Sequence, residues 1–258
     1  MPLDIGGTVL NNIQSYNLAN YSVPTSGLQV FLTTKLTESY PGSGTTWYDV
    51  SGNGKHFTWV TTPNTSSYST GSHFVTAGNR CKGPASNNVG ITNTSGYTIF
   101  LMQRQNTVAS STSAFKFYTT SGYNASTAGR GIFAHNTWGD GNVYFDQGGC
   151  CGGDTRTYTS AGGDTTDFWH VFGFRRLTSS STRTIFKNGI SIAENTAAAA
   201  DINLGSTQID LGSSDEYGGD SSNWNARISA FLVYNRGLTD AEMLQTSQSI
   251  RNLHGVPT

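Results

Sequence analysis

Short runs of β-branched and aromatic residues, each bounded by Gly, Ser or Asn, recur along the chain from residue 27 onward. Runs of this kind are typical of β-strands. In the longest run, Phe168, His170, Phe172 and Phe174 recur at every second position, which places them on one face of a strand. The predicted strands are 28–32, 72–77, 97–103, 114–118, 130–135, 142–146, 168–176, 183–187, 190–193, 208–211 and 227–234. Their spacing, mostly about ten residues, favours a two-sheet sandwich or jelly roll.

The clearest turn signal is Asn188-Gly189, which separates two of the predicted strands. A two-residue type I′ turn needs positive φ at both central residues, and Asn followed by Gly accepts this most readily. We therefore predict a β-hairpin over residues 183–193.

One helix is predicted, at the C-terminal end of the sequence. Thr239 followed three residues later by Glu242 matches a capping box, in which each residue bonds the other's backbone N–H. Gly255 is expected to end the helix. The residues expected on its apolar side are Leu244, Ile250 and Leu253.

The composition narrows the function classes. Only 12% of the 258 residues are charged and the net charge is -1, which argues against a nucleic-acid binder, because such proteins need a basic surface. No run approaches about 18 apolar residues, so no membrane-spanning segment is expected. Three Cys give no disulfide framework. The N-terminus lacks a basic segment followed by an apolar run, so we expect no signal peptide and synthesis in a cytoplasm.

Residues 40–56 read Tyr-Pro-Gly-Ser-Gly-Thr-Thr-Trp-Tyr-Asp-Val-Ser-Gly-Asn-Gly-Lys-His. Pro41 favours a first turn, and Trp47 then precedes a second turn made by residues 49–54. The side chains of Asp49 and Asn53 can bond the backbone of this second turn. The stretch predicts a rigid polar loop that an aromatic residue anchors to the core.

This stretch resembles the opening signature of laminin-G-like, concanavalin-A-like lectin domains, in the version found in structural proteins of tailed bacteriophages, including those of marine cyanobacteria. Residues 135–148, 169–189 and 227–242 resemble later segments of the same family. The resemblance covers roughly residues 26–256. It implies an all-β fold of two antiparallel sheets in a jelly roll, spanning residues 26–258, with residues 1–25 as a separate N-terminal arm.

No cofactor is expected, with one exception that the resemblance raises: a calcium ion held at the 49–54 loop. Asp49 and Asn53 would supply oxygen ligands, which calcium prefers. Many family members add an acidic pair in the closing strand, where this chain has Ser229 and Ala230. The loop acids that could replace that pair are Asp215, Glu216 and Asp220. The alternative is that Asp49 and Asn53 only satisfy the backbone of their turn.

A catalytic role finds little support in the sequence. Glucanases on the concanavalin-A-like fold carry two carboxylates on one strand, as Glu-x-Asp-x-x-Glu or close to it, to act as acid and nucleophile. The four Glu of this chain do not fit that pattern. The sequence also lacks a Gly-x-Ser-x-Gly elbow and a His-x-x-x-His zinc spacing. We therefore expect a protein without enzymatic activity.

Glycan binding is the more plausible chemistry, because sugars are held by aromatic faces together with a few polar side chains. Trp138 and Asp140 lie in the polar stretch Asn-Thr-Trp-Gly-Asp-Gly, and Trp224 lies in Ser-Ser-Asn-Trp-Asn-Ala. These residues are the candidates for an exposed binding platform. The alternative is that both Trp residues anchor the structure. Trp47, Trp59 and Trp169 lie beside predicted strands and are expected in the core.

The leading hypothesis is a non-enzymatic virion protein of a tailed phage that displays a lectin-like domain on the virion surface and aids adhesion. It would serve as a capsid decoration, head fibre or tail-associated protein, made in the host cytoplasm and attached to other virion proteins through residues 1–25. The alternatives are a glycan-binding adhesin for host recognition and a glycan hydrolase. The expected partners are virion proteins and host surface glycans, without nucleic acid or membrane, and homo-oligomerisation stays open.

Overall fold

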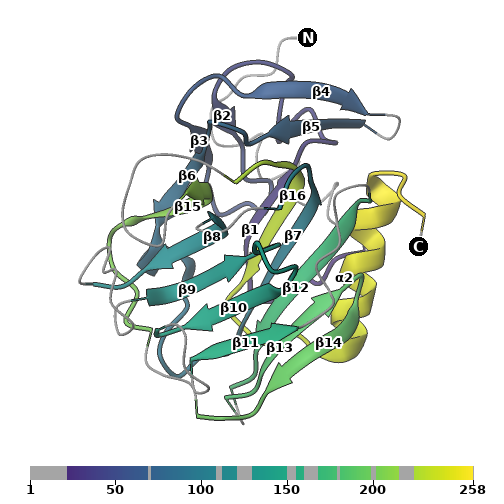
Figure 1. Cartoon of the computed structure of the whole chain (residues 1–258). Coiled ribbons are helices and arrows are strands. Elements are labelled where there is room, and N and C mark those ends of the chain that lie inside the picture. The colour runs from purple at the N-terminus through teal and green to yellow at the C-terminus, as the bar shows by residue number, and fades with distance from the viewer. Residues whose placement is uncertain are drawn as a thin grey trace.

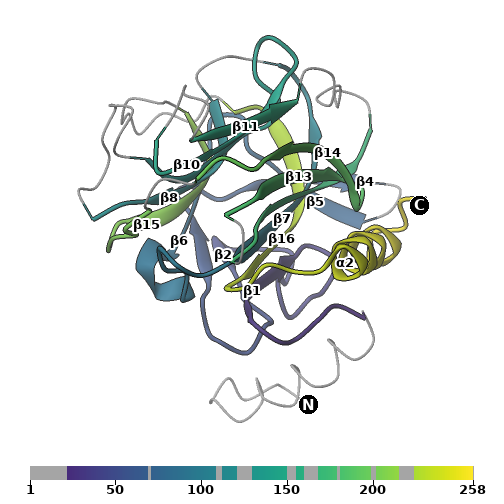
Figure 2. The ribbon, with the colours of Figure 1, turned by 90° about the horizontal axis from the view of Figure 1, so that it is seen from below.

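The structure is a computed structural model that describes residues 22–68, 71–108, 112–120, 130–149, 155–159, 168–178, 181–198, 202–214 and 224–257. Over these residues two antiparallel sheets pack face to face as a sandwich (Figure 1). Helix α2 (Asp240–Leu253) lies outside one sheet, on the side away from the other (Figure 2). The all-β, two-sheet fold with one C-terminal helix is therefore confirmed.

Sheet A contains most of the strands that the sequence predicts. Its order is β14 (Ile190–Asn195), β13 (Arg183–Lys187), β12 (His170–Arg176), β7 (Tyr97–Gln105), β16 (Ala226–Tyr234), β5 (Gly71–Val75) and β4 (Asn64–Tyr68). Strand β1 (Leu28–Thr33) pairs with residues 230–234 of β16, while β5 pairs with residues 227–228. The predicted hairpin joins β13 to β14, and Asn188 and Gly189 both have positive φ, as a type I′ turn requires.

Sheet B is the layer that carries the candidate site. Its order is β11 (Arg156–Thr159), β10 (Val143–Gln147), β9 (Arg130–His135), β8 (Thr112–Tyr118), β15 (Gln208–Ser214), β6 (Cys81–Ala85), β3 (Phe57–Trp59) and β2 (Thr46–Trp47). A short 3-10 helix, η1 (Ser86–Val89), follows β6. Strands β8 to β11 are neighbours in the order of the chain, so their connecting loops lie at the two ends of the sheet.

Aromatic rings fill the space between the sheets. Trp47 and Trp59 stack with their ring centroids 6.4 Å apart, and each lies 4.8 Å from the ring of Phe74. All three are almost fully buried. Burying one such side chain contributes roughly 1.5–3 kcal/mol or more, so this cluster is a main source of stability. The core position expected for Trp47 and Trp59 is confirmed.

A second apolar cluster lies between helix α2 and the outer face of sheet A. Met243 and Ile250 of the helix pack there against a group that includes Phe100 and Val171. The buried helix positions are 243, 246, 247 and 250, which are spaced as one face of a helix. Leu244 is 36% exposed, so its predicted place on the apolar side is wrong. Trp169 is also buried in this cluster, as expected.

The predicted capping box is present at the start of α2. The hydroxyl oxygen of Thr239 accepts a hydrogen bond from the backbone N–H of Glu242 at 3.2 Å, and the Glu242 carboxylate accepts one from the N–H of Thr239 at 2.8 Å. Gly255, with φ of 66°, follows the last turn. The helix therefore begins and ends where the sequence predicts.

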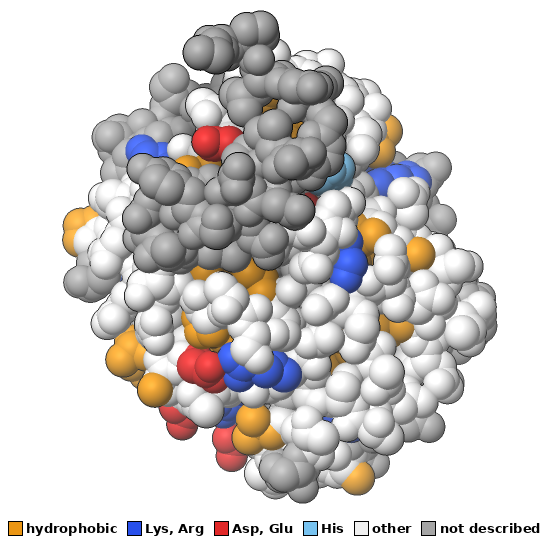
Figure 3. All heavy atoms as spheres, turned by 180° about the vertical axis from the view of Figure 1, so that it is seen from behind, with side chains coloured by type: hydrophobic (Ala, Val, Ile, Leu, Met, Phe, Trp, Pro, Cys, Tyr) orange, Lys and Arg blue, Asp and Glu red, His pale blue; other side chains and the backbone are white. Residues whose placement is uncertain are grey.

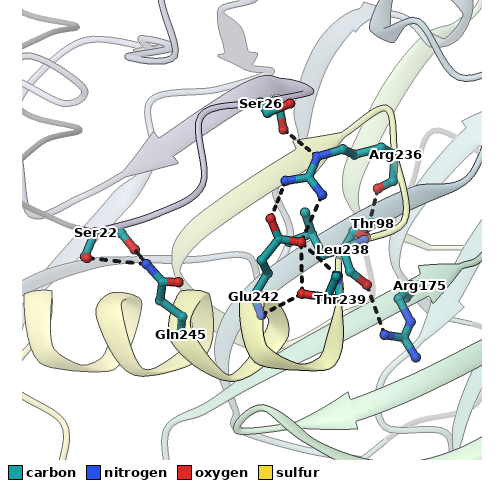
Figure 4. Close-up of polar contacts among 9 residues, drawn as sticks. All are labelled: Ser22, Ser26, Thr98, Arg175, Arg236, Leu238, Thr239, Glu242 and Gln245. Atoms are coloured by element: carbon teal, nitrogen blue, oxygen red, sulfur yellow. Dashed lines mark hydrogen bonds and ion pairs between the residues drawn. The ribbon is translucent and has the colours of Figure 1, made fainter.

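The chain entering β1 is tied to this helix (Figure 4). Arg236 forms an ion pair of 2.6 Å with Glu242 and donates from Nε to the Ser26 carbonyl at 2.8 Å. Gln245 donates to the Ser22 carbonyl at 2.6 Å. Residues 22–26 are thus held against α2. Residues 1–21 of the predicted arm lie outside the described residues.

The surface reflects the low charge of the sequence. On the face drawn in Figure 3, charged side chains occur in a few small groups among neutral ones. No helix in the described part of the chain is long and apolar enough to cross a membrane.

Candidate functional site

The loop of residues 136–142, which joins β9 to β10, carries two of the predicted site residues. The N–H of Trp138 donates to the carbonyl of Asn142, and the N–H of Gly141 donates to the carbonyl of Trp138, both at 2.9 Å. Gly141 has φ of 85°, a left-handed conformation that favours glycine. The loop is therefore a tight turn that holds Trp138 and Asp140 close together.

The base of this loop is bonded across the sandwich to sheet A. Gln105 of β7 donates to the carbonyl of Thr137 at 3.1 Å and accepts a hydrogen bond from the N–H of the same residue. Gln103, two residues earlier, donates to the carbonyl of Asn136 at 3.2 Å. The peptide bond between Asn136 and Thr137 is cis. The hydrogen bonds from Gln103 and Gln105 tie the base of the loop to the core of the domain.

Trp224 does not form part of an exposed platform, which corrects the prediction. Its side chain is fully buried, and its indole N–H donates to the carbonyl of Asn136 at 2.8 Å. A buried indole is stable when its N–H has an acceptor, and the loop backbone supplies one here. Trp224 therefore anchors the base of the 136–142 loop, which agrees with the alternative that this residue has a structural role.

Asp140 lies exposed at the tip of the same loop. Its carboxylate accepts a hydrogen bond from the Tyr144 hydroxyl at 2.6 Å and two bonds of 2.9 Å from the backbone and side chain of Asn142. Burial would raise the pKa of Asp140, but these hydrogen bonds outweigh it and lower the pKa below its usual value. Asp140 is thus an ionised acceptor at neutral pH, held in a fixed orientation.

Aromatic rings adjoin this carboxylate on the outward face of sheet B. Val143 and Phe145 point into the core, so Tyr144 between them points outward. Tyr144 is paired directly with Tyr158 of β11, and their rings lie 5.8 Å apart with an interplanar angle of 31°. Trp138 meets Tyr144 edge-on at 6.2 Å. We call Trp138, Asp140, Asn142, Tyr144 and Tyr158 the outer-face cluster.

Tyr158 is the most accessible ring of the outer-face cluster, at 59% exposure, whereas Trp138 and Tyr144 are partly buried. Sequence reasoning missed Tyr158. The available signal was a single aromatic residue in the polar stretch Arg-Thr-Tyr-Thr, which lacks the apolar neighbours of a core strand. Its pairing with Tyr144 depends on the register of β10 and β11, which only the structure gives.

An ion pair lies beside the cluster on the same face of the sheet. Arg156 binds Asp146 with two hydrogen bonds of 2.6 Å, and His135 Nε2 lies 3.4 Å from the same carboxylate. Burial would raise the pKa of Asp146, but the bonds from Arg156 and His135 outweigh it and lower the pKa to about 2. The Arg156 guanidinium also lies 4.4 Å from the centre of the Tyr144 ring, a cation–π contact.

The predicted calcium ligand Asp49 is occupied by protein donors. One carboxylate oxygen accepts bonds of 2.9 Å from the N–H groups of Phe31 and Ser51, and the other accepts bonds from the Ser51 hydroxyl and the Lys55 N–H at 2.8 and 3.0 Å. Calcium needs six to eight oxygens with free lone pairs. The buried, fully bonded Asp49 does not fit such a site.

The side chain of Asn53 also forms hydrogen bonds with backbone groups. Its amide donates to the carbonyls of Leu28 and Gln29 at 3.0 and 3.2 Å, which fastens the 49–54 loop to β1. Within the described residues, no group of three or more His, Cys, Asp or Glu is arranged to hold a metal ion. The structure thus favours the alternative in which Asp49 and Asn53 stabilise their turn. The proposed substitute acids, residues 215, 216 and 220, lie outside the described residues.

No protein-family model and no curated protein matches this sequence. The structure is similar to Trypanosoma rangeli sialidase, solved with 2,3-difluorosialic acid, at 12% identity and a TM-score of 0.66, covering 95% of this chain and 38% of that one. It is similar to the binding domain of Paraclostridial Mosquitocidal Protein 1 at 14% identity and a TM-score of 0.63, covering 90% and 55%.

A third similar structure is domain 4 of AbnA, a GH43 extracellular arabinanase from Geobacillus stearothermophilus, solved with arabinotriose. The identity is 14% and the TM-score 0.61, with 86% of this chain and 99% of that domain covered. The chain spans little more than a third of the sialidase. These similarities establish a β-sandwich fold that occurs in proteins acting on or binding carbohydrates. None of the three is a phage protein, so the phage-type resemblance stays a prediction.

Proposed function

We propose that this chain is a non-enzymatic glycan-binding module and that the outer-face cluster is its binding surface. The observation that carries the proposal is the exposed Tyr158 ring, which lies beside Tyr144 and the oriented carboxylate of Asp140. An aromatic face accepts the apolar face of a sugar ring, while a fixed carboxylate accepts hydrogen bonds from its hydroxyls. The likeness to an arabinanase domain solved with arabinotriose supports the same ligand class.

The two buried carboxylates on the outward face of sheet B, Asp146 and Asp210, lie too far apart to act together in hydrolysis. Asp210, Lys116, Phe133 and Asp146 are register partners on β15, β8, β9 and β10. With strands about 4.8 Å apart, the two Asp residues are separated by roughly 14 Å. A pair of catalytic carboxyl groups in a glycosidase lies about 5–10 Å apart. Asp146 is in addition fully engaged by Arg156.

The test is a binding measurement on Tyr158→Ala with polysaccharides and host cells as ligands. Loss of the exposed ring should weaken glycan binding by about tenfold without unfolding the domain, because stacking on an aromatic ring contributes about 1 kcal/mol or more. Tyr48→Ala is the matched control, since Tyr48 is also an exposed tyrosine but lies in the 49–54 loop region, away from the cluster. Equal binding by both variants would place the glycan elsewhere.

The setting of this module is a second part of the proposal. The resemblance of residues 40–56 supports a place on the surface of a tailed-phage virion, as a capsid decoration, head fibre or tail-associated protein. Residues 1–25 would attach it to other virion proteins. Phage carrying a deletion of residues 1–21, which leaves the segment bonded to α2 in place, should then assemble particles that lack this protein, while the truncated chain remains folded. Normal incorporation of the truncated chain would contradict the attachment role.

A further inference from the structure

We infer that the outer-face cluster selects neutral glycans and rejects anionic ones, such as sialylated or uronic-acid chains. This inference rests on the proposed function, because it names the ligand class of the same site. The similar solved structures do not decide the point, since one was solved with a sialic-acid derivative and another with the neutral arabinotriose. The charged side chains around the cluster indicate which of the two ligand classes is bound.

The charge that the cluster itself presents is negative. Asp140 is exposed, and three hydrogen bonds from Asn142 and Tyr144 hold its carboxylate in place. A carboxylate accepts hydrogen bonds from sugar hydroxyls but repels a ligand carboxylate brought within a few ångströms. An anionic sugar stacked on Tyr158 would therefore meet a like charge at the hydroxyl of the adjacent Tyr144 ring.

The neighbouring cation cannot compensate for this charge. Arg156 directs its Nε and Nη2 to Asp146 at 2.6 Å, in the two-pronged geometry that guanidinium and carboxylate prefer. Its guanidinium carbon also lies 4.4 Å from the centre of the Tyr144 ring, a cation–π contact. A ligand carboxylate would have to compete with a buried counter-charge for the same donors. Lys116, further along the same face, is itself 1% exposed.

The test measures binding to matched glycan pairs whose members differ only in an acidic sugar, for example lactose and 3′-sialyllactose. Neutral polysaccharides and polysaccharides that contain uronic acid are measured in the same way. Full-length protein should bind the neutral members at least about tenfold more tightly than their acidic counterparts. Tighter binding of the acidic members would overturn the inference and leave the proposed function standing. Binding to no glycan on the set would overturn the proposed function and the inference with it.

Asp140→Asn tests the residue that makes the selection. The variant should bind neutral glycans at least about fivefold more weakly and should lose discrimination between the two members of each pair. Glu38→Gln is the matched control, because Glu38 is an exposed acid away from the cluster and its substitution changes the net charge equally. If both variants change the discrimination by the same factor, selection comes from net charge and the inference fails. Thermal unfolding of each variant confirms that the fold is retained.

Discussion

Asp146→Asn should destabilise the protein by about 2 kcal/mol at neutral pH. The Asp146 side chain is fully buried, and its pKa is about 2 in the folded protein against an ordinary value of 3.8. At about 1.4 kcal/mol per pKa unit, the difference corresponds to roughly 2 kcal/mol of stability. The substitution also leaves Arg156 beside a neutral partner. Arg156 is 17% exposed, so water relieves part of that penalty and keeps the loss below the 3–5 kcal/mol typical of a fully buried broken pair.

The loss of stability in Asp146→Asn should depend on pH in a defined way. Since the folded-state pKa of Asp146 is lower than the unfolded value of 3.8, its stabilisation is fully present above that value. The stabilisation is lost as pH falls from 3.8 toward 2. Urea denaturation of the wild type and Asp146→Asn at pH 7, 5, 4 and 3 should therefore show a difference that is constant between pH 7 and 5 and shrinks below pH 4.

The control is Asp240→Asn, which breaks another 2.6 Å pair, with Arg175, but at a carboxylate that is 83% exposed. Exposed pairs contribute little, and the charge at a helix start adds a few tenths of a kcal/mol, so the loss should stay below about 1 kcal/mol. Equal losses for the two variants would refute the reasoning. So would a loss for Asp146→Asn that is as large at pH 3 as at pH 7.

Two further predictions concern stability. Burial, and to a lesser degree the charge of Lys35, lowers the pKa of His254 from 6.5 to about 3, so below pH 6.5 the unfolded chain takes up a proton that the folded chain does not. Stability should fall from pH 7 to 4.5, and His254→Gln should flatten that fall in urea denaturation; an unchanged slope would contradict it. Gly189 has φ of +85°, and an added Cβ would lie 2.8 Å from the Leu244 Cα, so Gly189→Ala should lose about 2 kcal/mol. Gly42→Ala, with φ of +90° and open space, should lose about 1 kcal/mol, and equal losses would exclude the close contact.

The strands that could be predicted from the sequence are those that bury a continuous apolar face. Strands β7 and β16, each nine residues long, are built largely of residues that are buried in the core, so propensity and burial agree there. The strands that were not predicted, β2, β3, β4, β6 and β11, are short or polar. Strand β6 even contains Gly83 and Pro84, and an added Cβ on Gly83 would meet the Phe57 ring at 2.3 Å. Their conformation depends on neighbouring strands, which a local pattern does not reveal.

The candidate site was only partly predictable for the same reason. Trp138 and Asp140 share one short polar loop, so the sequence places them together. Trp224 lies in an equally polar stretch, yet its indole is buried because a carbonyl from the 136–142 loop, far away in sequence, accepts its N–H. Polarity of the flanking residues predicts a loop, but it does not predict which way an aromatic side chain in that loop points.

The register of one strand pair connects stability to binding in this protein. On β11, Arg156 and Tyr158 are two residues apart and so lie on the same face of sheet B, opposite Asp146 and Tyr144 of β10. The ion pair and the aromatic pair are therefore set by the same register. A one-residue slip would turn Arg156 and Tyr158 away from their partners together and bury the Arg156 charge in the core. Among the described strands β11 pairs only with β10, and the Asp146–Arg156 pair thus keeps this strand in the register that presents Tyr158 on the same face as the site of Asp140.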